Sequence, residues 1–243
     1  MLLRIMAGFA LCVSTIFFGA NHRPETQVYG VTRNEDLADM RLEGVRIEAQ
    51  NIGSLLSDLS LSHNIPIGLE TAQNDDGLGS YEIDFKGGSL AELLTQFVAQ
   101  HGQYAWEIKD GVVNVFPKDS YRDALFRELL KTKISNFSVK EKTSCQTLAD
   151  SLVATPEAKQ ILQAQGTSYR VPSFHGFYIP QVGRHFTLVA SNLTLQSILN
   201  RVIEGSPAAK FWIIARNKSD QSFFISLSAR HEDSPIDTGK PGS

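Results

Sequence analysis

The sequence lacks the cysteine and histidine patterns that would reveal a disulfide framework or a metal centre. Its 243 residues contain two cysteines and six histidines. No two histidines stand four residues apart, and no cysteine–histidine ligand spacing occurs, so neither a metal ligand nor a cofactor is expected. Cys12 lies in an apolar N-terminal stretch, which leaves Cys145 alone in the folded part. A lone cysteine in a helical pattern usually serves as a small buried hydrophobe.

Motifs of catalysis are also missing. A serine hydrolase would need its nucleophile on a sharp turn such as Gly-x-Ser-x-Gly, and the chain has no such motif. Residues 74–77 lack the alternating acids of a calcium loop and are better explained as a turn. Gly87-Gly88 lacks the lysine of a phosphate loop and precedes a helix start. We therefore predict no catalytic residue, and we expect His63 and His101 to cap helix ends.

Long runs of apolar and small residues are absent except at the N-terminus. Residues 5–20 carry no charge and follow Arg4, a pattern typical of a secretory signal peptide. The run is shorter than the about 20 apolar residues that usually span a bilayer. We predict a signal peptide at residues 1–20, with an uncleaved inner-membrane anchor as the alternative, and hence a periplasmic or exported protein. Residues 21–44 are polar and aperiodic, which predicts a tether with a short turn of helix at 35–40. The tail at 232–243 is charged, rich in proline and glycine, and expected to be disordered.

Basic side chains are scarce in the first part of the folded chain, and basic side chains outnumber acidic ones in the second part. Residues 45–117 hold three basic and ten acidic side chains, a net charge of −7. Residues 118–231 hold fifteen basic and eight acidic side chains, a net charge of +7. This split suggests that the halves attract each other, and that a hinge between them opens when salt screens the attraction. The alternative is drift in solvated surface charge.

Residues 45–117 alternate between the period of strands and the period of helices. Apolar side chains alternate with polar ones over 45–49, 65–69, 81–85, 104–108 and 113–115. Leucines recur at helical spacing over 52–59 and 90–98, and Ser89 can cap the second of these helices. Asp110-Gly111 is a strong signal for a two-residue hairpin. The predicted order is β-α-β-β-α-β-β, a small α+β module.

Part of this module recurs later in the chain. Five apolar positions of the second helix (Leu90, Leu93, Leu94, Phe97, Val98) match five others at one offset (Leu195, Ile198, Leu199, Val202, Ile203). Each copy is followed by a strand with a tryptophan, Trp106 or Trp212, which is expected to pack in the core. We therefore predict an α+β fold of two tandem modules, at 45–117 and 133–231. An amphipathic helix at 118–132 joins them, and an insertion at 154–183 interrupts the second.

Three motifs of the first module carry a family resemblance. They are Val45-Arg-Ile-Glu-Ala-Gln-Asn-Ile, Leu55-x-x-x-Leu59, and the stretch from Lys86-Gly-Gly-Ser-Leu-x-x-Leu-Leu to Asp110-Gly-Val-Val-Asn-Val-Phe-Pro117. In these motifs the module resembles the secretin and TonB short N-terminal (STN) domain, over less than a third of the chain. Members of that family are periplasmic, non-catalytic modules that contact other proteins. No secretin pore or β-barrel sequence follows in this chain, so the resemblance implies a stand-alone or membrane-tethered relative.

Two classes of function remain open. The first is an exported, non-enzymatic protein–protein interaction module of the bacterial cell envelope, an accessory to a secretion, pilus or transport system, which binds an envelope protein by a sheet edge or groove. The second is a small-ligand-binding protein or enzyme that uses the insertion together with Arg170 and His185. The candidate interaction surface in the insertion comprises Phe174, His175, Phe177, Tyr178 and Ile179. The alternative interpretation of these residues is an aromatic cluster that packs under a long loop and binds nothing. Nucleic acid is not an expected partner, because an exported protein is separated from the usual nucleic-acid substrates.

Overall fold

The computed structural model describes residues 34–73, 79–141, 143–171, 181–182, 186–217, 220 and 222–229. Within these ranges the elements are α1 (Asn34–Ala38), β1 (Arg41–Leu42), β2 (Val45–Ala49), α2 (Ile52–His63), β3 (Ile67–Glu70), β4 (Tyr81–Phe85), β5 (Gly88–Ser89), α3 (Leu90–Gln100), β6 (Tyr104–Lys109), β7 (Val112–Pro117), the 3₁₀ turn η1 (Asp119–Tyr121), α4 (Ala124–Lys131), β8 (Lys133–Val139), α5 (Cys145–Val153), α6 (Pro156–Ala164), β9 (Leu188–Thr194), α7 (Leu195–Gly205), β10 (Ala209–Arg216) and β11 (Phe223–Ala229). The fold is α+β, as predicted. No helix in the described ranges is long and apolar enough to cross a membrane.

The central element is a five-stranded sheet that both halves of the chain build. We call residues 34–117 the first half and residues 118–229 the second half. The strand order is β11-β10-β3-β7-β6, so the second half supplies two strands and the first half three. β3 pairs in parallel with β7 on one side and with β10 on the other, where Gly68 lies opposite Trp212. Because one sheet runs through both halves, backbone hydrogen bonds join them, and the junction is not the ionic hinge that the charge split suggested.

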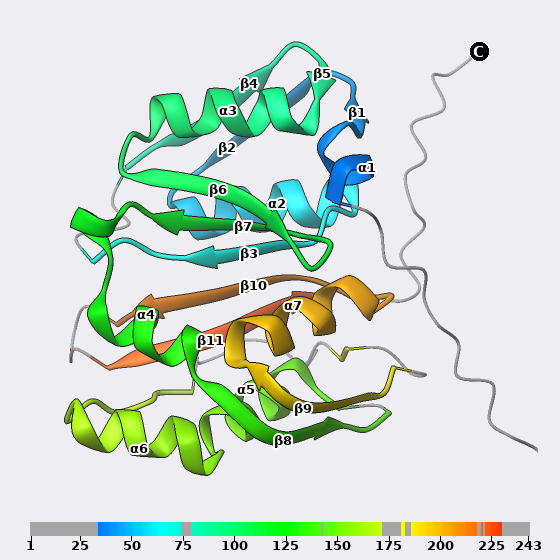
Figure 1. Ribbon diagram of the computed structural model, residues 1–243. Coiled ribbons are helices and arrows are strands. Elements are labelled where there is room, and N and C mark those ends of the chain that lie inside the picture. The colour runs from blue at the N-terminus through cyan, green and yellow to red at the C-terminus, as the bar shows by residue number, and fades with distance from the viewer. Residues whose placement is uncertain are drawn as a thin grey trace, which may run out of the picture.

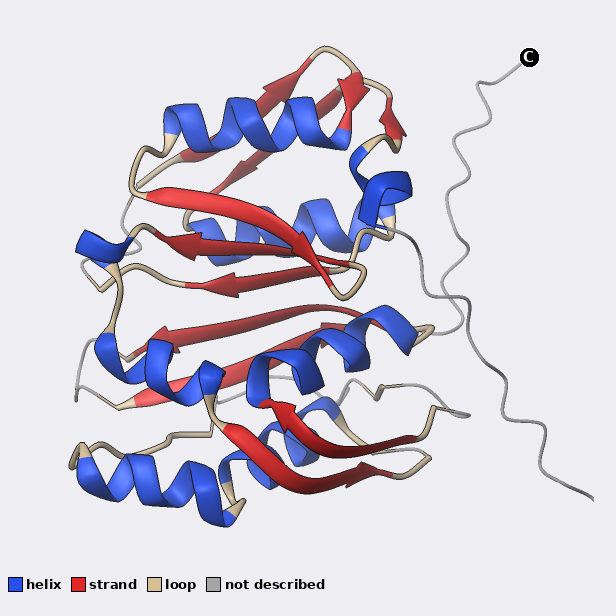
Figure 2. Cartoon of the chain, in the orientation of Figure 1, coloured by secondary structure: helices blue, strands red, loops and turns tan. Residues whose placement is uncertain are grey.

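Helices cover both faces of the central sheet (Figures 1 and 2). α2 and α3 lie on one face, and the antiparallel pair β2–β4 lies outside them. α5 and α7 lie on the other face, and the antiparallel pair β8–β9 lies outside them. α2 also packs against β10 of the second half. The layers on the two sides of the shared sheet therefore mirror each other in composition.

Local signals in the first half place its elements where the sequence predicts them. Asn51 caps α2, and its side chain accepts a hydrogen bond from the Ser54 amide at 2.8 Å. Ser89 and Glu92 form the reciprocal hydrogen bonds of a capping box at the start of α3. Asp110 and Gly111 have φ angles of 55° and 71°, the left-handed values that a two-residue hairpin between β6 and β7 requires. The order β-α-β-β-α-β-β is thus confirmed for this half.

The short turn of helix predicted at 35–40 is confirmed as α1 at residues 34–38, but the prediction of a tether is wrong for residues 34–44. β1 pairs antiparallel with β5, with Arg41 opposite Ser89. Leu37 and Leu42 are buried in the core of the first half. Two leucines in a polar segment are too few to show a period, so the sequence did not reveal this packing. Residues 21–33 lie outside the described residues, as do the predicted signal segment at 1–20 and the tail at 232–243.

The linker helix predicted over 118–132 begins later than expected. η1 comes first, and α4 starts only after Asp123, whose carboxylate accepts a hydrogen bond from the Leu125 amide at 2.9 Å. Asp123 also binds Arg216 of β10 at 2.7 Å, which fixes it as the capping residue. The predicted apolar stripe of the helix is buried as expected at Leu125, Phe126, Leu129 and Leu130. Tyr121 lies in η1 instead and is exposed.

The second half repeats the strand pairing of the first. The antiparallel pair β8–β9 corresponds to the antiparallel pair β2–β4 of the first half. A parallel bridge between Tyr169 and Phe223 of β11 corresponds to the parallel pairing of β3 with β7. β8 runs without interruption through Asn136 and Phe137. The predicted insertion contains a further helix, α6, which begins at Pro156. These pairings support the tandem repeat, which itself stays a prediction.

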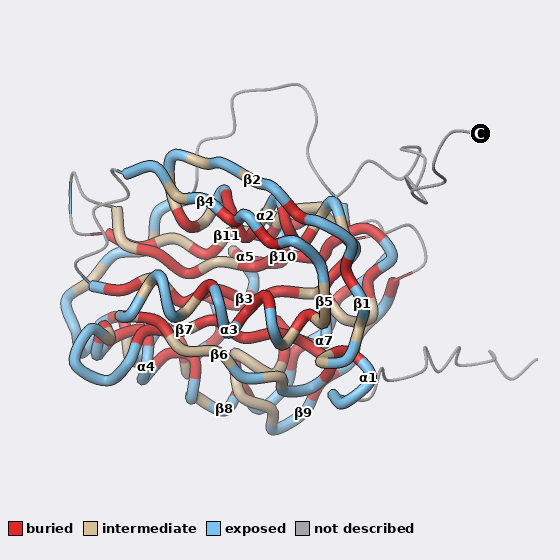
Figure 3. The backbone as a smooth tube through the Cα atoms, turned by 90° about the horizontal axis from the view of Figure 1, so that it is seen from above, coloured by how far each residue is buried: buried red, intermediate tan, exposed pale blue. Residues whose placement is uncertain are grey.

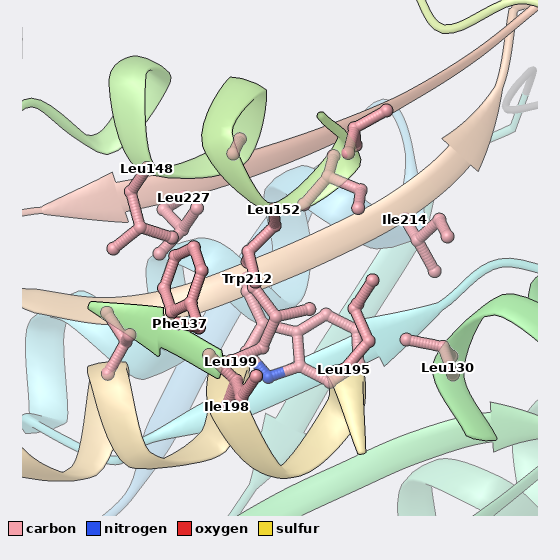
Figure 4. Close-up of a cluster of buried hydrophobic side chains, with 14 of the residues drawn as sticks. Leu130, Phe137, Leu148, Leu152, Leu195, Ile198, Leu199, Trp212, Ile214 and Leu227 are labelled. Atoms are coloured by element: carbon pink, nitrogen blue, oxygen red, sulfur yellow. The ribbon is translucent and has the colours of Figure 1, made fainter. Parts of the chain in front are cut away.

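The buried side chains form two hydrophobic clusters, one mainly from each half, with Val112 in the cluster of the second half and Phe211 in that of the first. Figure 3 marks the buried residues along the backbone. Trp212 lies in the cluster of the second half, among Leu152, Leu195 and Leu199 (Figure 4). Its indole N–H donates to the Oδ1 atom of Asn200 at 2.9 Å, so this buried polar atom is satisfied. The prediction that Trp212 is a core residue is confirmed. Trp106, the matching residue of the first half, is only partly buried.

Candidate interaction edge and groove

The interaction surface predicted in the insertion lies outside the described residues. Its members are Phe174, His175, Phe177, Tyr178 and Ile179, and the structure describes none of residues 172–180. That surface stays a prediction. His185, which the ligand-binding hypothesis required, also lies outside the described residues, and the guanidinium of Arg170 binds Asp220 at 2.5 Å.

Of the predicted helix caps, His101 ends α3, whereas α2 ends at His63 and its C-cap residue is Asn64. In the described ranges, no group of three histidine, cysteine, aspartate or glutamate residues could hold a metal ion. His101 is the C-cap residue of α3, as predicted, and its ring lies 4.7 Å from the ring of Phe97. Cys145 is buried at the start of α5, and burial raises the pKa of its thiol to about 12. A thiol with such a pKa stays protonated and unreactive at neutral pH.

β6 lies at the edge of the central sheet and pairs with β7 alone among the described strands (Figure 1). The two-residue turn makes Lys109 and Val112 the hydrogen-bonded pair that closes the hairpin. Hydrogen-bonded pairs alternate along the ladder, so the amide and carbonyl groups of Trp106 and Ile108 point away from β7. α1 approaches the turn end of the strand, where the side chain of Asn34 accepts from the Gly111 amide at 3.1 Å. Trp106 and Ile108 therefore offer backbone groups with which another strand can pair.

The two faces of β6 differ in chemistry. Tyr104, Trp106 and Ile108 face the core of the first half. Glu107 and Lys109 point to the opposite face and are exposed. This second face looks toward α4 and α7 of the second half, so both halves of the chain border the edge of β6.

A groove of about 270 Å³ lies beside this second face of β6. It is lined by Glu107 and Lys109 of β6, Phe116 of β7, Arg122 at the end of η1, Leu130 and Lys131 of α4, Thr194 of β9, and Gln196 of α7. The first half thus supplies one wall and the second half the other. The groove and the edge of β6 are continuous because they share Glu107 and Lys109.

Hydrogen bonds between the halves hold the two walls of the groove together. The side chain of Gln196 donates to Asn114 of β7 at 3.0 Å. The side chain of Asn200 donates to the Lys109 carbonyl at 3.3 Å and accepts from the Trp212 indole. Asn114 and Asn200 are buried, so breaking either contact would leave a polar group unsatisfied. The groove is therefore a fixed feature of the fold.

The charged side chains that line the groove differ in whether they can bind a partner. Arg122 binds Glu70 through two guanidinium nitrogens, with the shortest contact at 2.6 Å. Glu70 is almost fully buried, and burial raises the pKa of its carboxyl although the adjacent Arg122 opposes this shift. Lys109 and Lys131 form no ion pair with the other described residues, and both are exposed. The groove thus offers two available ammonium groups against one carboxylate, that of Glu107.

The sequence predicted parts of this site but not the site itself. The alternation at 104–108 and the Asp110-Gly111 turn predicted the β6–β7 hairpin correctly. Neither signal tells which strand of a sheet is outermost, because strand order depends on contacts between distant residues. Nothing in the sequence distinguishes Lys109 and Lys131 from other isolated surface lysines, which usually have no special role.

Comparison with known proteins gives no relative for this chain. No family model, no curated protein and no solved structure matches it.

Proposed function

We propose that this chain is an exported, non-enzymatic protein–protein interaction module of the bacterial cell envelope. It binds an extended segment of a partner protein by adding that segment as a strand to the edge of β6. The uncharged N-terminal run and the resemblance of the first module to STN domains support the envelope location. An accessory role in a secretion, pilus or transport system fits such a module.

The observation that carries this proposal is that β10, the strand of the second half that matches β6, already pairs with another strand along the edge that is open on β6. β6 and β10 are matching strands of the two halves, because each follows the repeated helix and forms a hairpin with the next strand. On its edge away from β11, β10 pairs in parallel with β3. The corresponding edge of β6 has no partner strand among the described residues. Strand addition is a common way for small sheets to bind peptides, because main-chain hydrogen bonds supply affinity while alternate side chains supply specificity.

Photo-crosslinking in the native bacterium tests the proposal. A photoreactive amino acid replaces Glu107, beside the edge of β6, and in a second strain it replaces Glu82, which is exposed on β4. We expect adducts from position 107 that map to one short segment of one envelope protein. Equal capture of the same proteins from position 82 would contradict the proposal.

A further inference from the structure

We infer that the partner segment is acidic and presents carboxylates at alternate positions to Lys109 and Lys131. This inference rests on the proposed function, because it describes the strand that is added to β6. It concerns the side chains of that strand, whereas the proposed function concerns its backbone. The two can therefore fail separately.

The geometry of strand addition determines which partner side chains enter the groove. Successive side chains of a strand point to opposite faces of the sheet. In a strand added to β6, one set lies on the face of Trp106, and the other lies on the face of Glu107 and Lys109. The second set is directed into the groove. Directly opposed side chains on neighbouring strands interact, so the charges on this face select the partner sequence.

The charges on that face favour carboxylates. Lys109 stands on β6 itself, and Lys131 lies across the groove at the end of α4. The groove also borders the start of α7, where Thr194 is the N-cap residue and the helix dipole is positive. Glu107 is the one carboxylate in the lining, and the two lysines outnumber it. The exposed lysines give the strand a preference in sequence rather than a high affinity.

A second copy of the chain that docked on β6 as β3 docks on β10 would lack the close apolar contact found there. The pairing of β3 with β10 also places α2 against β10, where Gly53 lies next to the side chain of Ile213. In the second half, Gln146 occupies the matching position of α5, and its amide binds Asp150 at 2.6 Å. On β6, Glu107 stands where β10 has Ile213, one residue after the tryptophan. A copy that repeated this docking would therefore place Gln146 against a charged carboxylate.

Peptide binding to the purified full chain tests the inference. The probes are two labelled ten-residue peptides, one alternating valine with glutamate and the other alternating valine with lysine, measured by fluorescence anisotropy at low salt. We expect the glutamate peptide to bind about tenfold more tightly, because exposed ion pairs contribute modestly and like charges repel. We expect Lys131→Glu and Lys109→Glu each to weaken its binding severalfold. Lys140→Glu is the matched control, because Lys140 is exposed after β8 and does not line the groove.

Two further glutamate peptides separate the inference from the proposed function. One is N-methylated at the valines and the other at the glutamates, and only one of these sets of amides can point toward β6. We expect one methylated peptide to lose binding and the other to keep it. If the glutamate and lysine peptides bind equally, and one methylated set still abolishes binding, the acidic preference is overturned and strand addition stands. If both methylated peptides bind as well as the parent, strand addition itself fails. Absence of binding by the glutamate peptide, or an unchanged affinity in both lysine variants, also overturns the inference.

Discussion

Gly68 of β3 lies directly beneath the indole of Trp212 of β10. The two residues are opposite each other on adjacent parallel strands, and one belongs to each half of the chain. A Cβ atom built on Gly68 would lie 2.2 Å from the Cε2 atom of Trp212, far inside van der Waals contact. The central sheet can close across the two halves only because this position has no side chain.

Gly68→Ala should therefore destabilise the whole protein. Trp212 is fully buried and its indole is hydrogen-bonded to Asn200, so it cannot move away from an added methyl group without loss. We expect the free energy of unfolding to fall by about 3 kcal/mol, the upper part of the range for overpacking a core. Chemical denaturation followed by tryptophan fluorescence measures it. Gly102→Ala is the control, since no atom lies within 4 Å of a Cβ placed there. Equal stability of the two variants would contradict the packing described.

Replacement of Glu70 should change how stability depends on pH. Burial raises the pKa of this carboxyl above its ordinary value of 4.5, so the folded state binds its proton more tightly than the unfolded state does. Its contribution is fully present below the ordinary pKa and is lost as pH rises through the folded pKa. We therefore expect Glu70→Gln to match the wild type in acid and to become the more stable of the two as pH rises. Denaturation midpoints of both proteins from pH 4 to pH 7 measure this. A wild type that gains on the variant as pH rises would mean that the ion pair with Arg122 outweighs burial.

Salt should leave the arrangement of the two halves unchanged. The charge split of the sequence suggested a hinge that opens in salt, but β3 and β10 are joined by backbone hydrogen bonds. The ion pair Glu70–Arg122 joins the halves, and the nearby pair Asp123–Arg216 lies within the second half. Both pairs are largely buried, and salt screens buried pairs weakly. We expect the same radius of gyration by small-angle scattering in low and high salt. A marked increase of the radius of gyration in high salt would instead support the hinge between the halves.

The N-terminal segment should direct export. Residues 1–44 fused to alkaline phosphatase, which is active only outside the cytoplasm, should give active enzyme in a bacterial host. Phe9→Arg interrupts the uncharged run and should abolish that activity. Enzyme that stays inactive with the native segment would contradict the envelope location.

The sequence predicted the elements of the first half far better than their arrangement. Helix stripes, the cap at Ser89 and the turn at Asp110 are signals between residues close in sequence. The parallel pairing of β3 with β10 joins residues about 145 positions apart, as Gly68 and Trp212 show, and no local pattern encodes it. Gly68 reads in sequence only as a weak point in a strand, because its role depends on the indole that it meets. For the same reason the groove between Lys109 and Lys131 could not be predicted, since its walls come from different halves.

Amide hydrogen exchange along β6 tests strand addition most directly. The amides of Glu107 and Lys109 point toward β7, whereas those of Trp106 and Ile108 point to the open edge. On addition of the alternating valine–glutamate peptide to the full chain, we predict slower exchange at Trp106 and Ile108. Exchange at the exposed strand β2, including Glu48, should not change. Peptide binding that leaves the Trp106 and Ile108 amides unprotected, or that protects β2 instead, would contradict the account.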